Sequence, residues 1–275
     1  ICKGLFISNN GTMKKKIHTF FALLMGLVMT TGCIKENLED CDNVTIYFQY
    51  LADGDEDVLS KYISKIDLYV FDENECLVGK RTYESNELKD PKTVHSFRLS
   101  YGKQYRVVAV GNAFENTEVV NLEANDLYKI YIQSAAYGRA ETVSGYDENY
   151  VGGKSIIMPE EEGMMLHDTV TLRSAHINLD MRITGDGLVS PSKDGQQPYE
   201  VYIENSKPQI NMLNYVNTEA DCIYQPELVY DEEEKCYHTD YAALYRLDNR
   251  GEIDNNTCSH ILIVKNKLTG IDYSF

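Results

Sequence analysis

Two kinds of residue are scarce in this sequence, tryptophan and the basic amino acids. Tryptophan is absent, and 26 Lys and Arg residues stand against 43 Asp and Glu residues, a formal net charge of −17. A chain this acidic repels the phosphates of nucleic acids and the headgroups of anionic lipids. The charge balance therefore excludes a nucleic-acid-binding protein. The absence of Trp argues against an aromatic platform for glycans, in which Trp is usual.

The common motifs of enzymes and metal sites are also missing. The sequence has no HExxH, GxSxG, Walker or GxGxxG motif. The acidic stretch at residues 53–57 lacks the spacing of a calcium loop, and the run at 231–234 is expected to be a solvated hairpin tip. The histidines beyond the N-terminal segment are scattered singly, and we expect them to be structural: His95, His167, His176, His238 and His260. We therefore predict no catalytic residue, no metal, no cofactor and no enzymatic activity.

No hydrophobic run is long enough to cross a bilayer. The apolar stretch at residues 20–29 has about ten residues, whereas a membrane-spanning helix needs about 20. Three lysines at 14–16 precede it and small residues at 30–32 follow it, which is the arrangement of a secretory signal. We expect the signal peptide to cover residues 13–32, and residues 1–12 to be a non-native extension upstream of the true start at Met13.

The end of this signal resembles the lipobox of bacterial lipoproteins, at Thr31, Gly32 and Cys33. Thr30 is a departure, because Leu is usual there. We predict cleavage between Gly32 and Cys33 and lipidation of Cys33, with an ordinary secretory signal beside a chance cysteine as the alternative. Several acyl chains on one cysteine would give a stable membrane anchor.

Residues 33–42 are then expected to be a lipidated tether. Its acidic residues Glu36, Glu39 and Asp40 resemble the surface-export signal of Bacteroidales lipoproteins. We therefore expect a protein of the outer membrane that is exposed at the cell surface, with a merely solvated tether as the alternative. Removal of residues 1–32 would leave 22 basic and 43 acidic residues, so the mature chain would be more acidic still.

Five cysteines remain beyond Cys33, at positions 41, 76, 222, 236 and 258. An odd number cannot be fully paired within one chain, and none of them forms a CxxC motif. Cys222 and Cys236 flank a predicted hairpin and could form a disulfide in an oxidising compartment. Buried free thiols are the alternative.

Short apolar segments separated by polar turns recur roughly every 10–15 residues and predict strands. They lie at residues 44–50, 66–71, 76–78, 93–99, 104–110, 170–183, 199–203, 208–213, 222–228, 237–247 and 259–265. Residues 122–134 fit a helix or a strand, and 145–153 are expected to be a loop. In the segment 170–183 the apolar residues change faces near Ser174, which indicates a bulge or a change of buried face.

No long segment keeps a helical period, so the pattern predicts an all-β chain of two tandem sandwiches. We place the boundary in the acidic stretch at 159–163, giving an N-terminal β-sandwich at 43–160 and a C-terminal one at 161–275. The strand pattern is still running at Phe275, so we expect the C-terminus to be truncated.

The order and spacing of five segments resemble the FimB-type fimbrial anchor lipoproteins of Bacteroidales. These segments are residues 33–41, 44–48, 66–72, 105–112 and 170–177. The resemblance implies two transthyretin-like β-sandwich domains with Greek-key connections. It also implies an anchor or assembly subunit of a type V pilus, with fimbrial stalk subunits and outer-membrane lipid as partners.

In the family that this resemblance names, polymerising subunits lose an N-terminal strand to an Arg-specific protease, and the vacated groove accepts a strand from a neighbour. Residues 34–80 contain no arginine, and the first one after Cys33 is Arg81. A subunit that stays on its lipid should lack such a cleavage site near the tether. The sequence therefore favours an anchor over a stalk subunit.

Two further hypotheses concern carbohydrate. Asp168, Thr169 and Val170 match a short O-glycosylation pattern of exported Bacteroidetes proteins, which predicts a glycan on Thr169, although so short a pattern also occurs by chance. The alternative function is a surface lipoprotein that binds glycans or other nutrients, with the Tyr-rich residues 146–150 stacking on sugars.

Overall fold

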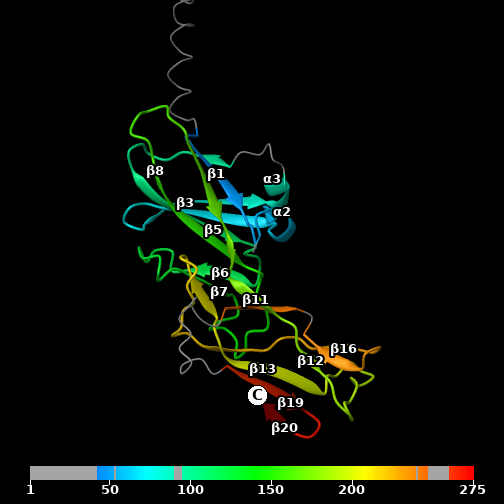
Figure 1. The fold of residues 1–275 in the computed structure, drawn as a ribbon. Helices are drawn as coiled ribbons and strands as arrows, with labels where there is room; N and C mark the ends of the chain where they lie inside the picture. The colour runs from blue at the N-terminus through cyan, green and yellow to red at the C-terminus, as the bar shows by residue number, and fades with distance from the viewer. Residues whose placement is uncertain (1–41, 53, 90–94, 240, 247–259) are drawn as a thin grey trace, which may run out of the picture.

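The computed structural model describes residues 42–52, 54–89, 95–239, 241–246 and 260–275 (Figure 1). Within these residues, helix is confined to two short segments, α2 (Leu59–Tyr62) and α3 (Ser85–Lys89), and strands dominate. The predicted all-β class is confirmed. The upstream extension, the signal peptide and nearly all of the tether lie outside the described residues.

The N-terminal part is a sandwich of two sheets. One is antiparallel with the order β10-β8-β5-β2-β3, and the other has the order β4-β1-β9, in which β1 and β9 run parallel. The five-stranded sheet consists of β2 (Lys65–Phe71), β3 (Leu77–Glu84), β5 (Gln104–Gly111), β8 (Tyr150–Ile157) and β10 (Arg173–Ser174). The three-stranded sheet consists of β1 (Val44–Gln49), β4 (Ser96–Phe97) and β9 (Leu166–Thr171).

The alternation of side chains along β2 supplies both faces of the five-stranded sheet. Ile66, Leu68 and Val70 belong to one buried cluster together with Val44 and Ile46 of β1. Burial on this face follows from the period of two along a strand, which directs every second side chain to the same side. This cluster is the core of the first sandwich.

The opposite face of the same sheet is buried as well. Tyr69 and Phe71 of β2 join a second cluster that contains Ile132, Ile210 and Tyr245 from segments much later in the chain. A strand buried on both sides reads as a nearly continuous apolar run, which is why residues 66–71 are such a clear strand in the sequence. The second cluster joins the first sandwich to the rest of the chain.

A small sheet with the order β14-β7-β6 contributes to this junction, and it lies between the two ends of the molecule in Figure 1. Its strands are β6 (Thr117–Val120), β7 (Tyr131–Ser134) and β14 (Gln209–Asn211). The ambiguous segment at 122–134 therefore consists of turns followed by a strand, and not of a helix.

The remaining strands form three further small sheets, with the orders β11-β18, β12-β17-β16 and β15-β13-β19-β20. The last of these lies at the far end of the molecule from β1 (Figure 1). The strands are β11 (His176–Leu179), β12 (Arg182–Ile183), β13 (Tyr199–Ser206), β15 (Cys222–Tyr224), β16 (Val229–Asp231), β17 (Cys236–His238), β18 (Ala242–Tyr245), β19 (Ile261–Asn266) and β20 (Ile271–Ser274). A third, smaller cluster packs between the last two of these sheets, with Tyr199, Val201, Leu228, Tyr237 and Val264.

The predicted long strand at 170–183 is divided among β9, β10, β11 and β12. Its first two pieces pair with β1 and β8 of the first sandwich, and its last two pair with β18 and β17. The expected change of face near Ser174 is thus where the chain leaves one set of sheets for another. This change falls between β10 and β11, and the domain boundary at residues 160 and 161 stays a prediction.

The expected loop at 145–153 is wrong in its second part, because β8 already begins at Tyr150. The misleading signal is the glycine pair at 152–153. A Cβ atom on Gly152 would lie 2.3 Å from the carbonyl oxygen of Thr171, so only glycine lets the chain cross from β9 to β10 this close to β8. The glycine marks a crossing of backbones and not a loop.

Candidate functional site

Asn43 fixes the place where the predicted tether joins the first sandwich. Its side chain is buried; Nδ2 donates to the carbonyl oxygen of Leu99 (2.8 Å), and Oδ1 accepts from the backbone N–H of Leu99 (2.9 Å). Its backbone N–H donates to the carbonyl of Phe97, and its own carbonyl accepts from the N–H of Leu166. These four hydrogen bonds hold the start of β1 to the two segments that flank it.

β1 is the middle strand of its sheet and is fully integrated there. Six consecutive residues of β1 pair with six of β9. Val44, Thr45 and Ile46 are completely buried, and the hydroxyl groups of Thr45 and Ser96 lie 3.0 Å apart in a hydrogen bond. The strand nearest the predicted lipid is therefore part of the core.

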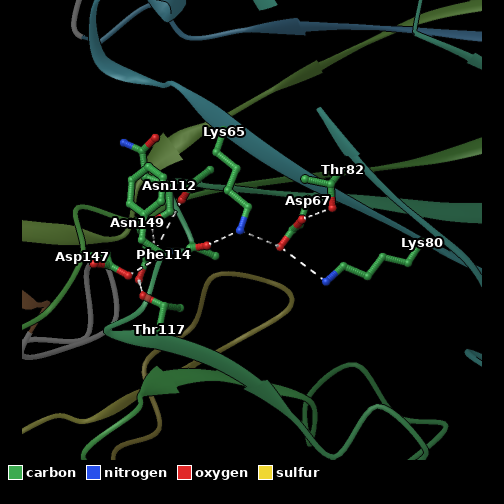
Figure 2. A network of polar contacts seen from close by, with 11 residues as sticks. Lys65, Asp67, Lys80, Thr82, Asn112, Phe114, Thr117, Asp147 and Asn149 are labelled. Carbon is green, nitrogen blue, oxygen red and sulfur yellow. Dashed lines mark hydrogen bonds and ion pairs between the residues drawn. The ribbon is translucent and has the colours of Figure 1, made fainter. Parts of the chain in front are cut away.

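A polar network lies where β2 begins and β5 ends and includes side chains of β3, on the face of the sheet that meets the later strands. Figure 2 shows Asp67 between Lys65, Lys80 and the hydroxyl of Thr82. The Asp67 carboxylate is buried, accepts a hydrogen bond from Thr82, and lies 3.4 Å from the Lys80 ammonium group. Lys65 Nζ also donates to the carbonyl of Ala113 (2.6 Å). A buried carboxylate with these partners is costly to disrupt.

The same network continues to Asn149, which precedes β8. Asn149 Nδ2 donates to the carbonyl of Asn112 (3.0 Å), and its Oδ1 accepts from the hydroxyl groups of Thr117 (3.0 Å) and Tyr245 (2.8 Å). Asp147 accepts from the backbone N–H of Phe114 (2.9 Å), as Figure 2 shows. Tyr245 belongs to β18, so this network joins the first sandwich to the later sheets.

Burial fixes the protonation of Tyr245 in that network. The desolvation of its fully buried ring raises the pKa of Tyr245 far above that of an exposed tyrosine. The hydroxyl is therefore neutral at physiological pH and can act as the donor to Asn149.

β20 is an outer strand of its sheet and, among the described strands, pairs only with β19. Backbone N–H and C=O groups of Leu262 and Phe275 bond to each other, so along β20 the odd-numbered residues face β19 and the backbone groups of Asp272 and Ser274 face outward. All four residues of β20 are exposed, among them Ile271 and Tyr273. An open edge with exposed apolar side chains is a template for pairing with another strand.

The predicted lipidation and cleavage residues, Gly32 and Cys33, lie outside the described residues. Thr169, the predicted glycosylation site, lies in β9 with its side chain exposed. Its backbone N–H donates to Oδ1 of Asp168 (2.8 Å), which also binds the ammonium group of Lys154. The hydroxyl is thus accessible, and the modification stays a prediction.

The two cysteines of the predicted disulfide are free thiols in the structure. Cys222 lies in β15 and Cys236 in β17, and these strands belong to different sheets. The Cys222 thiol instead contacts the hydroxyl of Tyr146 at 3.4 Å, and burial raises the pKa of Cys222. The strands do not form the hairpin that would bring the two sulfurs together.

Two of the histidines have structural surroundings, as expected. His176 donates from Nδ1 to the carbonyl of Asn149 (2.9 Å), and His95 is buried between the rings of Phe48 and Tyr83. In the described part of the chain, no group of three or more His, Cys, Asp or Glu residues could hold a metal ion. None of its helices is long and apolar enough to span a membrane.

Several solved structures are similar in fold to this chain. The Mfa2 fimbrial anchor protein of Porphyromonas gingivalis has a TM-score of 0.61 at 14% identity, over 86% of this chain and 82% of that one. A candidate polysaccharide-binding protein of Bacteroides thetaiotaomicron has a TM-score of 0.63 at 16% identity, over 85% and 78%. A candidate adhesin of Bacteroides ovatus has a TM-score of 0.64 at 15% identity, over 88% and 78%.

No curated protein matches the sequence. The model of the fimbrillin-A associated anchor proteins Mfa1 and Mfa2, in contrast, matches residues 38–273. The match begins inside the predicted tether and covers both sets of sheets, and it confirms the resemblance to fimbrial anchors. The chain belongs to the family of fimbrillin-A associated anchor proteins Mfa1 and Mfa2.

Proposed function

We propose that this protein is an outer-membrane lipoprotein that anchors a fimbria at the cell surface and pairs with fimbrial subunits by strand addition. Its family is one of fimbrial anchors, which supports a structural role in a surface fibre and not an enzymatic one. In this proposal the lipid on Cys33 holds the protein in the membrane. The two sets of sheets are two transthyretin-like sandwiches with Greek-key connections, of which the second meets the fibre.

The observation that carries the proposal is the position of β1. This strand directly follows the predicted tether, is buried in the middle of its sheet, and pairs with β9 along six residues. No arginine lies between Cys33 and Arg81, so an Arg-specific protease has no target before β1 or within it. A subunit that keeps β1 stays joined to its lipid, as an anchor must.

The open edge of β20 is the surface that we assign to strand addition. Its outward N–H and C=O groups, at Asp272 and Ser274, can continue the ladder with an extended segment of a fimbrial subunit. The exposed apolar side chains of Ile271, Tyr273 and Phe275 would be covered by that segment. β20 lies at the end of the molecule away from β1 (Figure 1), which suits a protein that joins a membrane to a fibre.

The proposed lipidation of Cys33 is tested by the substitution Cys33→Ser in the cell that produces the protein. We expect the protein to lose incorporation of an alkyne-labelled fatty acid and to leave the membrane fraction, and electron microscopy should show fibres shed into the medium. Cys41→Ser, eight residues along, is the matched control and should keep both. Retention of the lipid label by Cys33→Ser would contradict the proposed anchor.

The edge of β20 is tested by Asp272→Pro, which removes an outward N–H but no bond to β19. We expect a stably folded protein that stays in the membrane and no longer retains fibres. Asp272→Asn keeps the backbone donor and should retain them. Normal retention of fibres by Asp272→Pro would exclude β20 as the pairing edge and leave the lipid anchor intact.

A further inference from the structure

A cleft of about 530 Å³ lies between the first sandwich and the later segments. One side consists of β8 at residues 151–154, of β9 and of Arg173. The other consists of residues 212–215 and Arg246. Its volume is within the range of small-ligand sites, roughly 300–1,000 Å³. Neither the lipid anchor nor the edge of β20 involves this cleft.

The charge of the cleft is opposite to that of the protein. Four basic side chains line it, Arg106, Lys154, Arg173 and Arg246, and none of its lining residues is acidic. The whole chain has a net charge of −17. Lys154 is bound to Asp168, whereas Arg106 and Arg173 form no ion pair among the described residues and give the cleft an excess of positive charge. A concave site with positive charge attracts anions, which the acidic remainder of the protein repels.

Hydrogen bonds fix two of these arginines in position. Arg246 donates from Nη2 to both the carbonyl oxygen and Oδ1 of Asn214, each at 2.6 Å. Arg106 donates from Nη1 to the hydroxyl of Ser155 (3.2 Å), and its Nε has no hydrogen-bond acceptor among the described residues. A guanidinium group held in place loses little further entropy when it binds a carboxylate.

An exposed aromatic pair stands at the same place. Tyr215 lines the cleft, and its ring stacks on that of Tyr128 with the centroids 6.2 Å apart and an angle of 21° between the planes. Tyr215 is 49% exposed and Tyr128 is 59% exposed. Large apolar faces left in solvent beside a polar cleft indicate a binding surface. The flat face of a tyrosine packs well against the C–H groups of a sugar ring.

We propose that this cleft binds an acidic carbohydrate, a glycan that contains a uronic or a sialic acid. The carboxylate of the sugar would pair with the guanidinium groups of Arg173 and its neighbours, and the pyranose ring would lie against Tyr215. A neutral glycan would offer Arg173 no carboxylate to pair with. An acidic peptide would use the arginines but would gain little from the stacked tyrosines. The proposal is independent of the anchoring function.

The experiment is isothermal titration of the full chain, purified in detergent from a host that does not glycosylate Thr169, with tetragalacturonic acid. We expect saturable binding that weakens as the salt concentration rises. Arg173→Gln and Tyr215→Ser should each weaken it about tenfold or more, the usual effect of losing a charge-assisted hydrogen bond or a stacked ring. The methyl ester of the same oligosaccharide, which has no charge, should bind at least about tenfold more weakly.

Two matched variants control for general effects. Arg182→Gln changes an exposed arginine in another two-residue strand, β12, and Tyr62→Ser changes a tyrosine that is 42% exposed in α2. Each should change the affinity by less than about twofold. Circular dichroism of all four variants should match that of the unchanged protein.

Three results would overturn the proposal. Absence of binding to tetragalacturonic acid would exclude the site. Binding of the methyl ester with the same affinity as the acid would show that the arginines do not bind a carboxylate. Equal or tighter binding of tetraglutamate, with Tyr215→Ser having no effect, would show that the cleft takes an acidic peptide and not a sugar.

Discussion

The first sandwich and the later sheets differ in how completely each forms its own core. In the first sandwich, a sheet of five strands and a sheet of three enclose sixteen buried residues. The strands from β11 onward are divided among small sheets, and their own cluster contains five buried residues. Much of their remaining apolar surface packs on the outer face of the five-stranded sheet. The later sheets thus depend on the first sandwich more than it depends on them.

The largest effect is expected from Phe71→Ala, which opens the cluster shared by the two regions. Phe71 is completely buried on the outer face of β2, and its truncation should cost about 4 kcal/mol. We expect hydrogen exchange to accelerate in β13 and β19 before it does so in β5. Leu68→Ala, in the same strand but on the inner face, should instead destabilise the first sandwich. Identical exchange patterns in the two variants would refute the asymmetry.

A matched pair of valines compares the two cores directly. Val44 of β1 and Val201 of β13 are both completely buried. We expect Val44→Ala to lower the free energy of unfolding by about 2.5 kcal/mol. Val201→Ala should lower it by about 1 kcal/mol, because the smaller cluster can relax around the lost methyl groups. Urea unfolding measures both, and an equal loss would mean that the later sheets are as tightly packed as the first sandwich.

The hydrogen bond between the regions is tested by Tyr245→Phe. Removing the donor to Asn149 should cost about 1 kcal/mol, and hydrogen exchange should show the loss around β18. Tyr83→Phe is the counterpart in the first sandwich, because the buried Tyr83 hydroxyl has no hydrogen-bond partner among the described residues. That change should be neutral or slightly stabilising. A loss of stability in Tyr83→Phe equal to that in Tyr245→Phe would remove this distinction.

The smallest effect concerns pH. Burial lowers the pKa of His95 in the first sandwich and also that of His260 beside β19. As the pH falls below about 6.5, the unfolded chain takes up these protons before the folded one, so stability is full above that pH and declines below it. His95→Gln should weaken the decline for the first sandwich and His260→Gln for the later sheets, as measured by urea unfolding at two pH values.

The strands of the first sandwich could be predicted because their signals are local. β2 and β5 are apolar runs between clear turns, and a strand buried on both faces needs no partner to be recognised. β8 is absent from the predicted strands because Gly152 and Gly153 are typical of a loop, and only the close approach of Thr171 to β8 explains why glycine is required. The all-β class follows from the regular spacing of the short apolar segments. The pairing of β9 with β1, in contrast, depends on contacts between residues more than a hundred positions apart.

The candidate sites, too, could be predicted only where their residues are neighbours in the sequence. The predicted lipobox at Cys33 is contiguous, so it can be proposed from the sequence alone, and it lies outside the described residues. The basic cleft could not, because Arg106, Arg173 and Arg246 are dispersed along an acidic chain and only the folded protein brings them together. The possible disulfide between Cys222 and Cys236 could not be judged from the sequence either, because the hairpin between them forms as β16 and β17 while Cys222 lies in a different sheet.

The parallel pairing of β1 with β9 has a mechanical consequence. The tether leaves the N-terminal end of β1, and the chain continues toward the later sheets from the C-terminal end of β9. A membrane that pulls on the first end and a fibre that pulls through the second would slide the strands past each other. The force would then act in shear on all six residue pairs together, instead of peeling them apart one by one. A joint of this geometry resists tension best along the strands, which is the direction of load that the proposed anchoring function predicts.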